Sequence, residues 1–284
     1  MKVNPIPLFT DNYCYLIHGS AKDKSFLVDP ADEKAVHDWL KKHPEYTISH
    51  ILVTHRHWDH AQGVPGLAER LKKDYQHSGK NSHIEIVVGA AEKQPYATKN
   101  VGSTGSFEVN DIRITHIPVP CHTIGHQLYY LEDLNHLETK NDPQEPKNLY
   151  RAVFTGDTLF IGGVGKFFEG GPTEMQKNFD EIRKLPKDTF VFCGHEYTLD
   201  NFKWAMGIYP ENEAVKKRYN WAKEMRAKGF YTVPSTVGDE IESNVFMMTR
   251  DQTLQKKFGV TNEIKLMEKL REWKDKKKTF SSEL

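Results

Sequence analysis

Short apolar runs, most of them bounded by Gly, Asp, Asn or Pro, dominate the first two-thirds of the chain. Such runs, about four to eight residues long and rich in β-branched residues, are typical of β-strands. They predict strands at 13–18, 26–28, 51–54, 84–88, 112–119, 128–131, 152–155 and 190–193. Apolar residues at helical spacing predict helices between them, at 33–42, 64–73 and 173–184. This part of the chain is therefore expected to be α/β.

The pattern changes after His195. Helix-length patterns follow at 199–208, 212–228 and 262–277, and strand signals almost disappear. We therefore predict a domain boundary near residue 196. An α/β domain would occupy residues 1–196, and a smaller all-α domain would occupy residues 197–284.

The charge balance and the cysteine content limit which binding partners and which cellular compartment we expect. Lys plus Arg and Asp plus Glu both number 39, so nothing global steers the protein toward nucleic acid or a membrane. No apolar run approaches the roughly 20 residues of a membrane span, and the first residues lack a signal-like apolar core. The three cysteines are far apart in sequence, which argues against a disulfide framework. We expect a cytoplasmic protein, and we expect a monomer.

A dense set of metal-ligand residue types follows the predicted strand 51–54. The segment reads His55-Arg56-His57-Trp58-Asp59-His60. On an extended chain His55 and His57 face the same way, so one ion can take both. Asp59 and His60 come where the chain is expected to turn, and they can aim at a second point. Imidazole and carboxylate suit zinc, iron or manganese. The alternative, a His-rich surface turn, fits poorly because the strand before it has a buried composition.

Three later strand ends carry further ligand types. His122, Asp157 and His195 each stand at such an end, beside Gly or Thr. Taken alone each is a weak signal, because an Asp after Gly at a strand end is usually a turn residue. Cys121 and Cys193 flank two of these positions, and we expect both to be small buried residues.

The order of these motifs resembles that of the metallo-β-lactamase superfamily. The chain reads His-x-His-x-Asp-His, then Cys-His-Thr, then Gly-Asp-Thr and then Gly-His. The resemblance implies an αββα sandwich, in which two mixed sheets pack face to face with helices outside and a metal site lies at one edge. It assigns His55, His57 and His122 to a first ion, Asp59, His60 and His195 to a second ion, and Asp157 to both. His126, four residues after His122, is a candidate support for that ligand or an ordinary structural residue.

Longer motifs resemble the glyoxalase II (hydroxyacylglutathione hydrolase) family over nearly the full chain. They lie at 10–13, 28–30, 155–160, 165–170, 193–198, 233–236 and 271–275. The resemblance implies a glutathione thioester substrate, chiefly S-lactoylglutathione, and products lactate and glutathione. It implies two divalent metal ions, with zinc expected first and iron or manganese as alternatives. A hydroxide bridging the ions, with Asp59 and Asp157 beside it, would attack the thioester carbonyl.

The same resemblance places Lys166, Phe168, Tyr197, Arg271 and Lys274 in the glutathione site. Phe168 departs from the family pattern, because many relatives have Tyr there, and a hydroxyl partner for glutathione is lost. Arg271 and Lys274 are three apart and share a helix face. Their spacing alone favours a solvated basic tail instead.

Two other functions compete with this one. A persulfide dioxygenase of the same superfamily would hold one iron and would not need the second ligand set, Asp59, His60 and His195. A scaffold without turnover would not need Lys166 and Arg271.

Overall fold

The computed structural model describes residues 1–135 and 150–280. Contacts divide the chain into two compact units. Unit 1 comprises residues 1–118 and 125–156, and unit 2 comprises residues 119–124 together with the chain from residue 157 onward. This division falls elsewhere than the predicted boundary at residue 196, which stays a prediction about domains.

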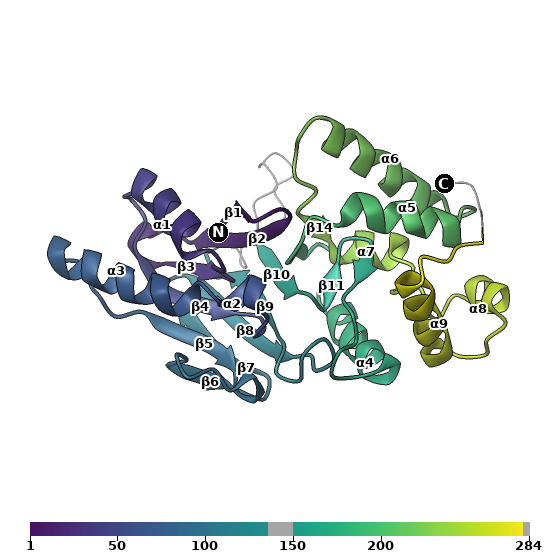
Figure 1. The fold of residues 1–284 in the computed structure, drawn as a ribbon, viewed down its shortest axis with the longest axis horizontal. Helices are drawn as coiled ribbons and strands as arrows, with labels where there is room; N and C mark the ends of the chain where they lie inside the picture. The colour runs from purple at the N-terminus through teal and green to yellow at the C-terminus, as the bar shows by residue number, and fades with distance from the viewer. Residues whose placement is uncertain (136–149, 281–284) are drawn as a thin grey trace. The chain divides into compact units, whose positions relative to one another are not determined.

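The first sheet of unit 1 has strand order β1-β2-β3-β4-β5-β6. Its strands are β1 (Lys2–Leu8), β2 (Asn12–His18), β3 (Ser25–Val28), β4 (Ile48–Val53), β5 (Glu85–Gly89) and β6 (Lys99–Val101). The strands β1 to β3 are antiparallel neighbours, and β3 to β6 are parallel. Parallel neighbours need crossover connections, and helices α1 (Glu33–Lys42) and α3 (Val64–Ser78) lie in two of them. Both helices pack on the same side of this sheet (Figure 1).

The second sheet of unit 1 is antiparallel. Its strands β7 (Gly105–Val109), β8 (Ile112–Pro118), β9 (Gln127–Asp133) and β10 (Arg151–Gly156) pair in that order. The Tyr129 hydroxyl of β9 donates to the carbonyl oxygens of Val53 at 2.9 Å and Val87 at 3.1 Å in the first sheet. The rings of Tyr15 and Phe154 meet edge to face, with centroids 5.2 Å apart. The two sheets therefore face each other, as the predicted sandwich requires.

Most predicted elements of unit 1 are present, and the differences have physical reasons. Helix α1 has the predicted bounds, because an apolar stripe buries Val36 and Leu40 and the Asp32 side chain caps its first turn. Strand β1 was not predicted, since its sequence holds two prolines. It is an edge strand, where missing N–H donors are tolerated.

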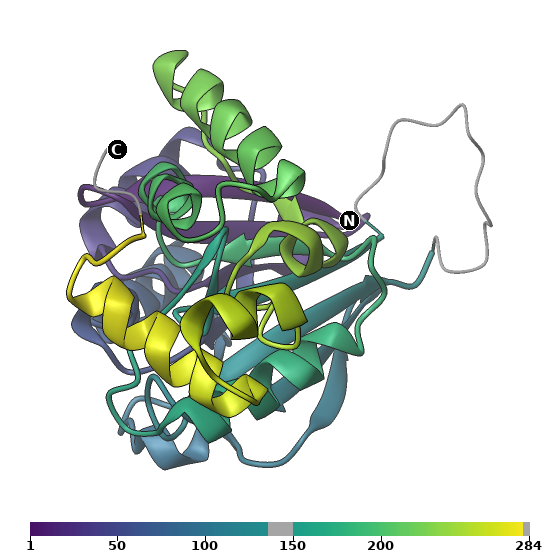
Figure 2. The ribbon, with the colours of Figure 1, turned by 90° about the vertical axis from the view of Figure 1, so that its right-hand side faces the viewer.

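Unit 2 is mainly helical. Its elements are hairpin strands β11 (Leu159–Phe160) and β12 (Gly163–Val164), helix α4 (Pro172–Arg183), strand β13 (Phe190–Cys193), helices α5 (Thr198–Ile208) and α6 (Glu213–Ala227), strand β14 (Ser235–Thr236), and helices α7 (Val237–Ser243), α8 (Gln252–Phe258) and α9 (Glu263–Asp275). Helix α5 packs on α6, and α4 packs on α9 (Figure 2). After residue 196 the predicted helical character is confirmed, apart from the two-residue strand β14, which pairs with β13.

A helix that spans a membrane needs about 20 mostly apolar residues. In the described parts of the chain, no helix combines the necessary length with the necessary apolar character.

Candidate metal centre

The ligand-type residues of unit 1 lie on a short segment that follows β4. The strand ends at Val53, and the four-residue helix α2 (Trp58–Ala61) then turns the chain. His55 and His60 are buried, with 0% and 1% of their surface exposed. The Nε2 atom of His55 lies 3.1 Å from Nδ1 of His57, and the ring centroids of His55 and His60 are 4.2 Å apart. The predicted histidine cluster of this segment is therefore formed inside unit 1.

A buried carboxylate, Asp29, orients two of these histidines. Asp29 accepts hydrogen bonds from the Thr54 amide at 2.7 Å and the Thr54 hydroxyl at 2.6 Å. Its other contact is His60 Nδ1, which lies 2.9 Å away. Because the Thr54 hydroxyl proton points at Asp29, the hydroxyl oxygen accepts from His55 Nδ1 at 3.0 Å. Both rings thus carry a proton on Nδ1 and present an Nε2 lone pair, as a metal ligand must.

Asp59 is fixed by a second buried polar residue. The Asn12 amide nitrogen donates to the Asp59 backbone oxygen at 2.9 Å and to its Oδ2 at 3.3 Å. Sequence reasoning assigned no role to Asn12 or Asp29. The feature that could have revealed their role is their position in the motifs at 10–13 and 28–30, which mark the ends of two strands.

His126 contacts a different ligand candidate from the one predicted. Its ring is fully buried and stacks on His55, with centroids 4.8 Å apart and an angle of 17°. Support of His122 by His126 therefore stays a prediction, while its packing against His55 is observed.

Unit 2 brings together the three later ligand candidates. Oδ2 of Asp157 lies 3.4 Å from Nε2 of His122, and Oδ1 lies 3.5 Å from Nε2 of His195. All three residues are buried. Each carboxylate oxygen thus faces one imidazole, so Asp157 could contribute a ligand beside each of these histidines.

The tautomer of His122 is compatible with a cation beside it. Its Nδ1 lies 2.9 Å from the Lys166 carbonyl oxygen, which can only accept, so Nδ1 carries a proton. In the neutral ring, Nε2 then has a lone pair facing the Asp157 carboxylate. A lone pair and a carboxylate repel each other unless a cation or a second ring proton lies between them. The backbone of Gly165 packs closely against both residues. A Cβ at this position would lie 1.9 Å from the Asp157 backbone oxygen and 3.1 Å from His122 Nδ1, so only glycine fits there.

The donor chemistry of both units fits a divalent ion. Zinc binds nitrogen and oxygen at about 2.0–2.2 Å, so two tetrahedral ligands of one ion lie roughly 3.3–3.5 Å apart. The two donor separations in unit 2, 3.4 Å and 3.5 Å, lie in this range, and the separation in unit 1, 3.1 Å, is slightly shorter. Neutral imidazoles and carboxylates without thiolate suit zinc, iron or manganese.

Three predicted glutathione contacts lie against the unit 2 ligands. The Tyr197 ring stacks on His195, with centroids 4.7 Å apart and planes 5° apart. Phe168 is 60% exposed and contacts His122 at 5.2 Å between centroids. Lys166 is exposed, and its carbonyl holds His122. An exposed apolar ring and an exposed phenol therefore flank the buried ligands, and the exposed Lys166 is joined to them through its backbone.

Arg271 and Lys274, the two cations near the end of α9, are not a solvated tail. Arg271 donates from Nη1 to the Val164 carbonyl at 3.0 Å and from Nη2 to Asp275 at 2.7 Å. Both terminal nitrogens have internal acceptors, while the buried Nε has no hydrogen-bond partner among the described residues. Burial, and then the Arg271 charge, lower the pKa of Lys274 to about 8. An anion reaching this helix would meet two desolvated cations.

The buried cysteines supply no nucleophile. Cys121 and Cys193 have no exposed surface. Burial raises the pKa of each thiol to about 12, so both stay protonated near neutral pH. Their expected role as small buried residues agrees with this environment.

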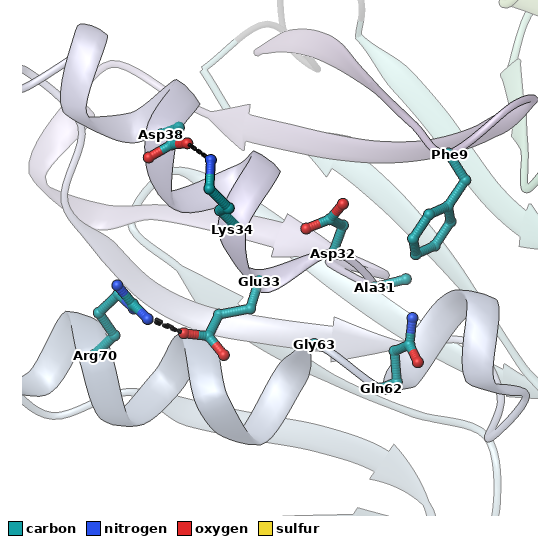
Figure 3. Close-up of a pocket in the computed structure, with 9 residues that line it drawn as sticks. All are labelled: Phe9, Ala31, Asp32, Glu33, Lys34, Asp38, Gln62, Gly63 and Arg70. Carbon is teal, nitrogen blue, oxygen red and sulfur yellow. Dashed lines mark hydrogen bonds and ion pairs between the residues drawn. The ribbon is translucent and has the colours of Figure 1, made fainter.

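A pocket of about 620 Å³ in unit 1 lies apart from these residues (Figure 3). None of the predicted site residues lines it. Arg70 pairs with Glu33 at 2.7 Å, and Lys34 pairs with Asp38 at 2.6 Å. Asp32 caps helix α1. Since these charges are already engaged, we assign no site to the pocket.

Two family models match the chain. The model described as "Hydroxyacylglutathione hydrolase C-terminus" matches residues 196–277. The model described as "Beta-lactamase superfamily domain" matches residues 24–165.

Similar proteins and structures agree with these matches. A protein named cytoplasmic hydroxyacylglutathione hydrolase, from Arabidopsis thaliana, is 36% identical over 277 residues, which are 97% of this chain and 98% of that protein. The crystal structure of ETHE1 from Myxococcus xanthus is 20% identical, covers 96% of this chain and 90% of its own, and superposes with a TM-score of 0.62. The crystal structure of TTHA1623 in a di-iron-bound form is 19% identical, covers 86% and 100%, and has a TM-score of 0.55. These structural likenesses confirm the predicted α/β sandwich fold.

Proposed function

Because the chain belongs to the hydroxyacylglutathione hydrolase (glyoxalase II) family of the metallo-β-lactamase superfamily, we propose that it hydrolyses S-(2-hydroxyacyl)glutathione thioesters. The chief substrate would be S-lactoylglutathione, and the products lactate and glutathione. The observation that best supports a metal-dependent reaction is Asp157, whose two oxygens each face one histidine. We further propose a monomer in the cytoplasm that needs no nucleic acid or membrane partner.

Two divalent ions would complete the proposed site. His55, His57 and His122 would hold the first, Asp59, His60 and His195 would hold the second, and Asp157 would serve both. The Nδ1 protonation of His55, His60 and His122 supports this assignment, because it puts the lone pair of each ring on Nε2, the atom that would coordinate. Zinc is our first expectation, with iron or manganese as alternatives that share the same ligands.

The reaction needs little acid–base help from the protein. When bound, the ions lower the pKa of water to about 7 and polarise the thioester carbonyl. Asp59 and Asp157 would orient the attacking water, which gives a proton to solvent as its oxygen bonds the carbonyl carbon and the carbonyl π electrons move to the carbonyl oxygen. The carbon–sulfur bond then breaks, and the thiolate leaves with the electron pair. A thiol has a pKa of about 8.5, so departure does not require a protein acid.

Residues of unit 2 would bind the glutathione part. Lys166, Arg271 and Lys274 supply cations for its two carboxylates, and Tyr197 supplies a phenol. Arg271 gives one N–H of Nη1 to Val164 and one N–H of Nη2 to Asp275, so each terminal nitrogen keeps a second N–H that could bind a carboxylate. The exposed Phe168 contributes an apolar contact in place of a hydroxyl.

Release of thiol from S-lactoylglutathione tests this function. Metal-loaded protein should release it catalytically, and His57→Ala should lower the rate by about 10³-fold or more, since ligand loss removes several kcal/mol of transition-state stabilisation. His77→Ala is the matched control, because His77 is exposed and, among the described residues, bonds only the Lys73 carbonyl. Absence of release, or equal rates for His57→Ala and the wild type, would contradict the proposal.

A further inference from the structure

The short hairpin β11–β12 connects two residues of the proposed site. Asp157 precedes it by two residues, and Lys166 follows it by two. The strands pair only Leu159 with Val164 and Phe160 with Gly163. Two-residue strands cannot hold their geometry alone, since even full isolated hairpins are marginally stable in water. Something else must fix this hairpin.

Three side chains from the helical part of unit 2 bond the hairpin backbone. Asn201 of α5 donates to the Ile161 carbonyl at 3.1 Å. Glu240 of α7 accepts from the Gly162 amide at 2.8 Å. Asn244, directly after α7, donates to the Gly163 carbonyl at 3.0 Å and to the Phe160 carbonyl at 3.3 Å. We call Asn201, Glu240 and Asn244 the hairpin clamp.

Glu240 is the centre of the clamp. It is fully buried, and burial raises the pKa of its carboxyl above the usual range, against the lowering effect of its hydrogen bonds. Its oxygens also accept from the Ser235 hydroxyl at 2.6 Å and the Asn244 amide at 3.0 Å. A buried carboxylate surrounded by donors fixes their positions, because any movement leaves a polar group unpaired in a medium of low dielectric constant.

The hairpin also lies directly against α5. Gly162 has φ +70°, and a Cβ there would come within 2.8 Å of the Phe202 ring. At Gly163 a Cβ would come within 2.5 Å of the Asn201 amide nitrogen. The two glycines therefore allow the hairpin backbone to contact α5, and the hydrogen bonds of the clamp then hold the backbone in this position.

We propose that Asn201, Glu240 and Asn244 are positioning residues, which hold the hairpin so that Asp157 and Lys166 keep their places beside His122. The catalytic meaning of this inference rests on the proposed function. Arg271 adds a link, since it donates to the Val164 carbonyl at the end of the same hairpin. The helical module would thus set the geometry of the ligands of unit 2 in addition to binding glutathione.

Asn244→Ala tests the clamp, because its amide nitrogen shares two N–H groups among both hairpin carbonyls and Glu240. We expect amide hydrogens of residues 158–166 to exchange at least about tenfold faster, and bound metal to be lost to a chelator faster than from the wild type. At saturating substrate and equal metal content, kcat should fall about tenfold. Asn201→Ala removes one hydrogen bond to the hairpin and should give smaller changes in the same direction. If Asn244→Ala does not fold, Asn201→Ala tests the clamp in its place.

Thr249→Val is the matched control. It breaks a buried bond of 2.6 Å to Gln176 in the same unit, and among the described residues no hydrogen bond joins either side chain to the hairpin. The control should lose thermal stability while keeping wild-type exchange at 158–166, metal retention and kcat. Unchanged exchange and kcat in the clamp variants, or equal losses in the control, would overturn the inference. If the wild type releases no thiol, the proposed function fails, but exchange and metal retention still decide the clamp.

Discussion

The two units present ligand candidates in opposite ways. In unit 1 they are close in sequence, from His55 to His60, and one buried carboxylate, Asp29, orients two of them. In unit 2 they come from three distant segments, at His122, Asp157 and His195. There a backbone carbonyl and helix side chains bonded to a short hairpin do the positioning.

This difference separates the expected effects of substitutions. A change at the orienting carboxylate of unit 1 should act on metal affinity, because nothing in that unit is expected to contact glutathione. A change on the surface of unit 2 should act on substrate binding, because the predicted glutathione contacts lie there. The following predictions test that separation, beginning with the largest effect.

Asp29→Ala should weaken metal binding by about 10–100-fold, the usual effect of losing a residue that orients a metal-binding histidine. His60 and Thr54 lose their shared acceptor, so the Nδ1 proton of His60 is no longer fixed. Metal affinity measured by competition with a chelator checks this. Asp32→Ala is the control: it removes the cap of α1, which costs about 1 kcal/mol of stability, and should leave metal affinity unchanged. Equal metal affinity in Asp29→Ala and the wild type would remove Asp29 from this role.

Lys274 should make kcat/KM depend on pH. Its pKa is lowered to about 8, so the ammonium that would bind a carboxylate is present below that pH and lost above it. With Lys274 as a required cation, kcat/KM should fall by about tenfold from pH 7 to pH 9, which follows from one deprotonation in the free enzyme. Lys274→Arg keeps its charge in this range and should flatten the profile. A fall of the same size in Lys274→Arg would assign the titration to another group.

Phe168→Tyr should have the smallest effect. The new hydroxyl can bond glutathione, and a single hydrogen bond contributes about 0.5–1.5 kcal/mol, so KM should fall by roughly 2- to 12-fold with kcat unchanged. Phe167→Tyr, at the half-buried neighbouring position, should leave KM unchanged. Steady-state kinetics of the two variants decide whether Phe168 contacts the substrate.

Local features of the chain were predictable from sequence. Helix α1 has its predicted bounds because its apolar spacing and its Asp32 cap agree. The cluster from His55 to His60 was recognisable because its ligand types are adjacent. Helix α2 was missed, since four residues are too few to show a helical period.

Long-range features were not predictable. Asp29 acts on Thr54 across 25 positions and on His60 across 31, and Asn244 reaches Gly163 across 81. A single polar residue carries no sign of such a partner, because a buried acceptor and a surface turn use the same residue types. Burial of Arg271 was likewise hidden, since the basic end of α9 looks solvated by composition.

The central claim is that hydrolysis depends on two bound metal ions, and a metal titration tests this claim most directly. Metal-free protein is loaded with zero to three equivalents of zinc, and thiol release from S-lactoylglutathione and oxygen consumption are followed at each step. We predict that release rises until about two equivalents are bound and that no oxygen is consumed. Full activity at one equivalent, oxygen uptake with iron in place of zinc, or no thiol release at any loading would contradict the account.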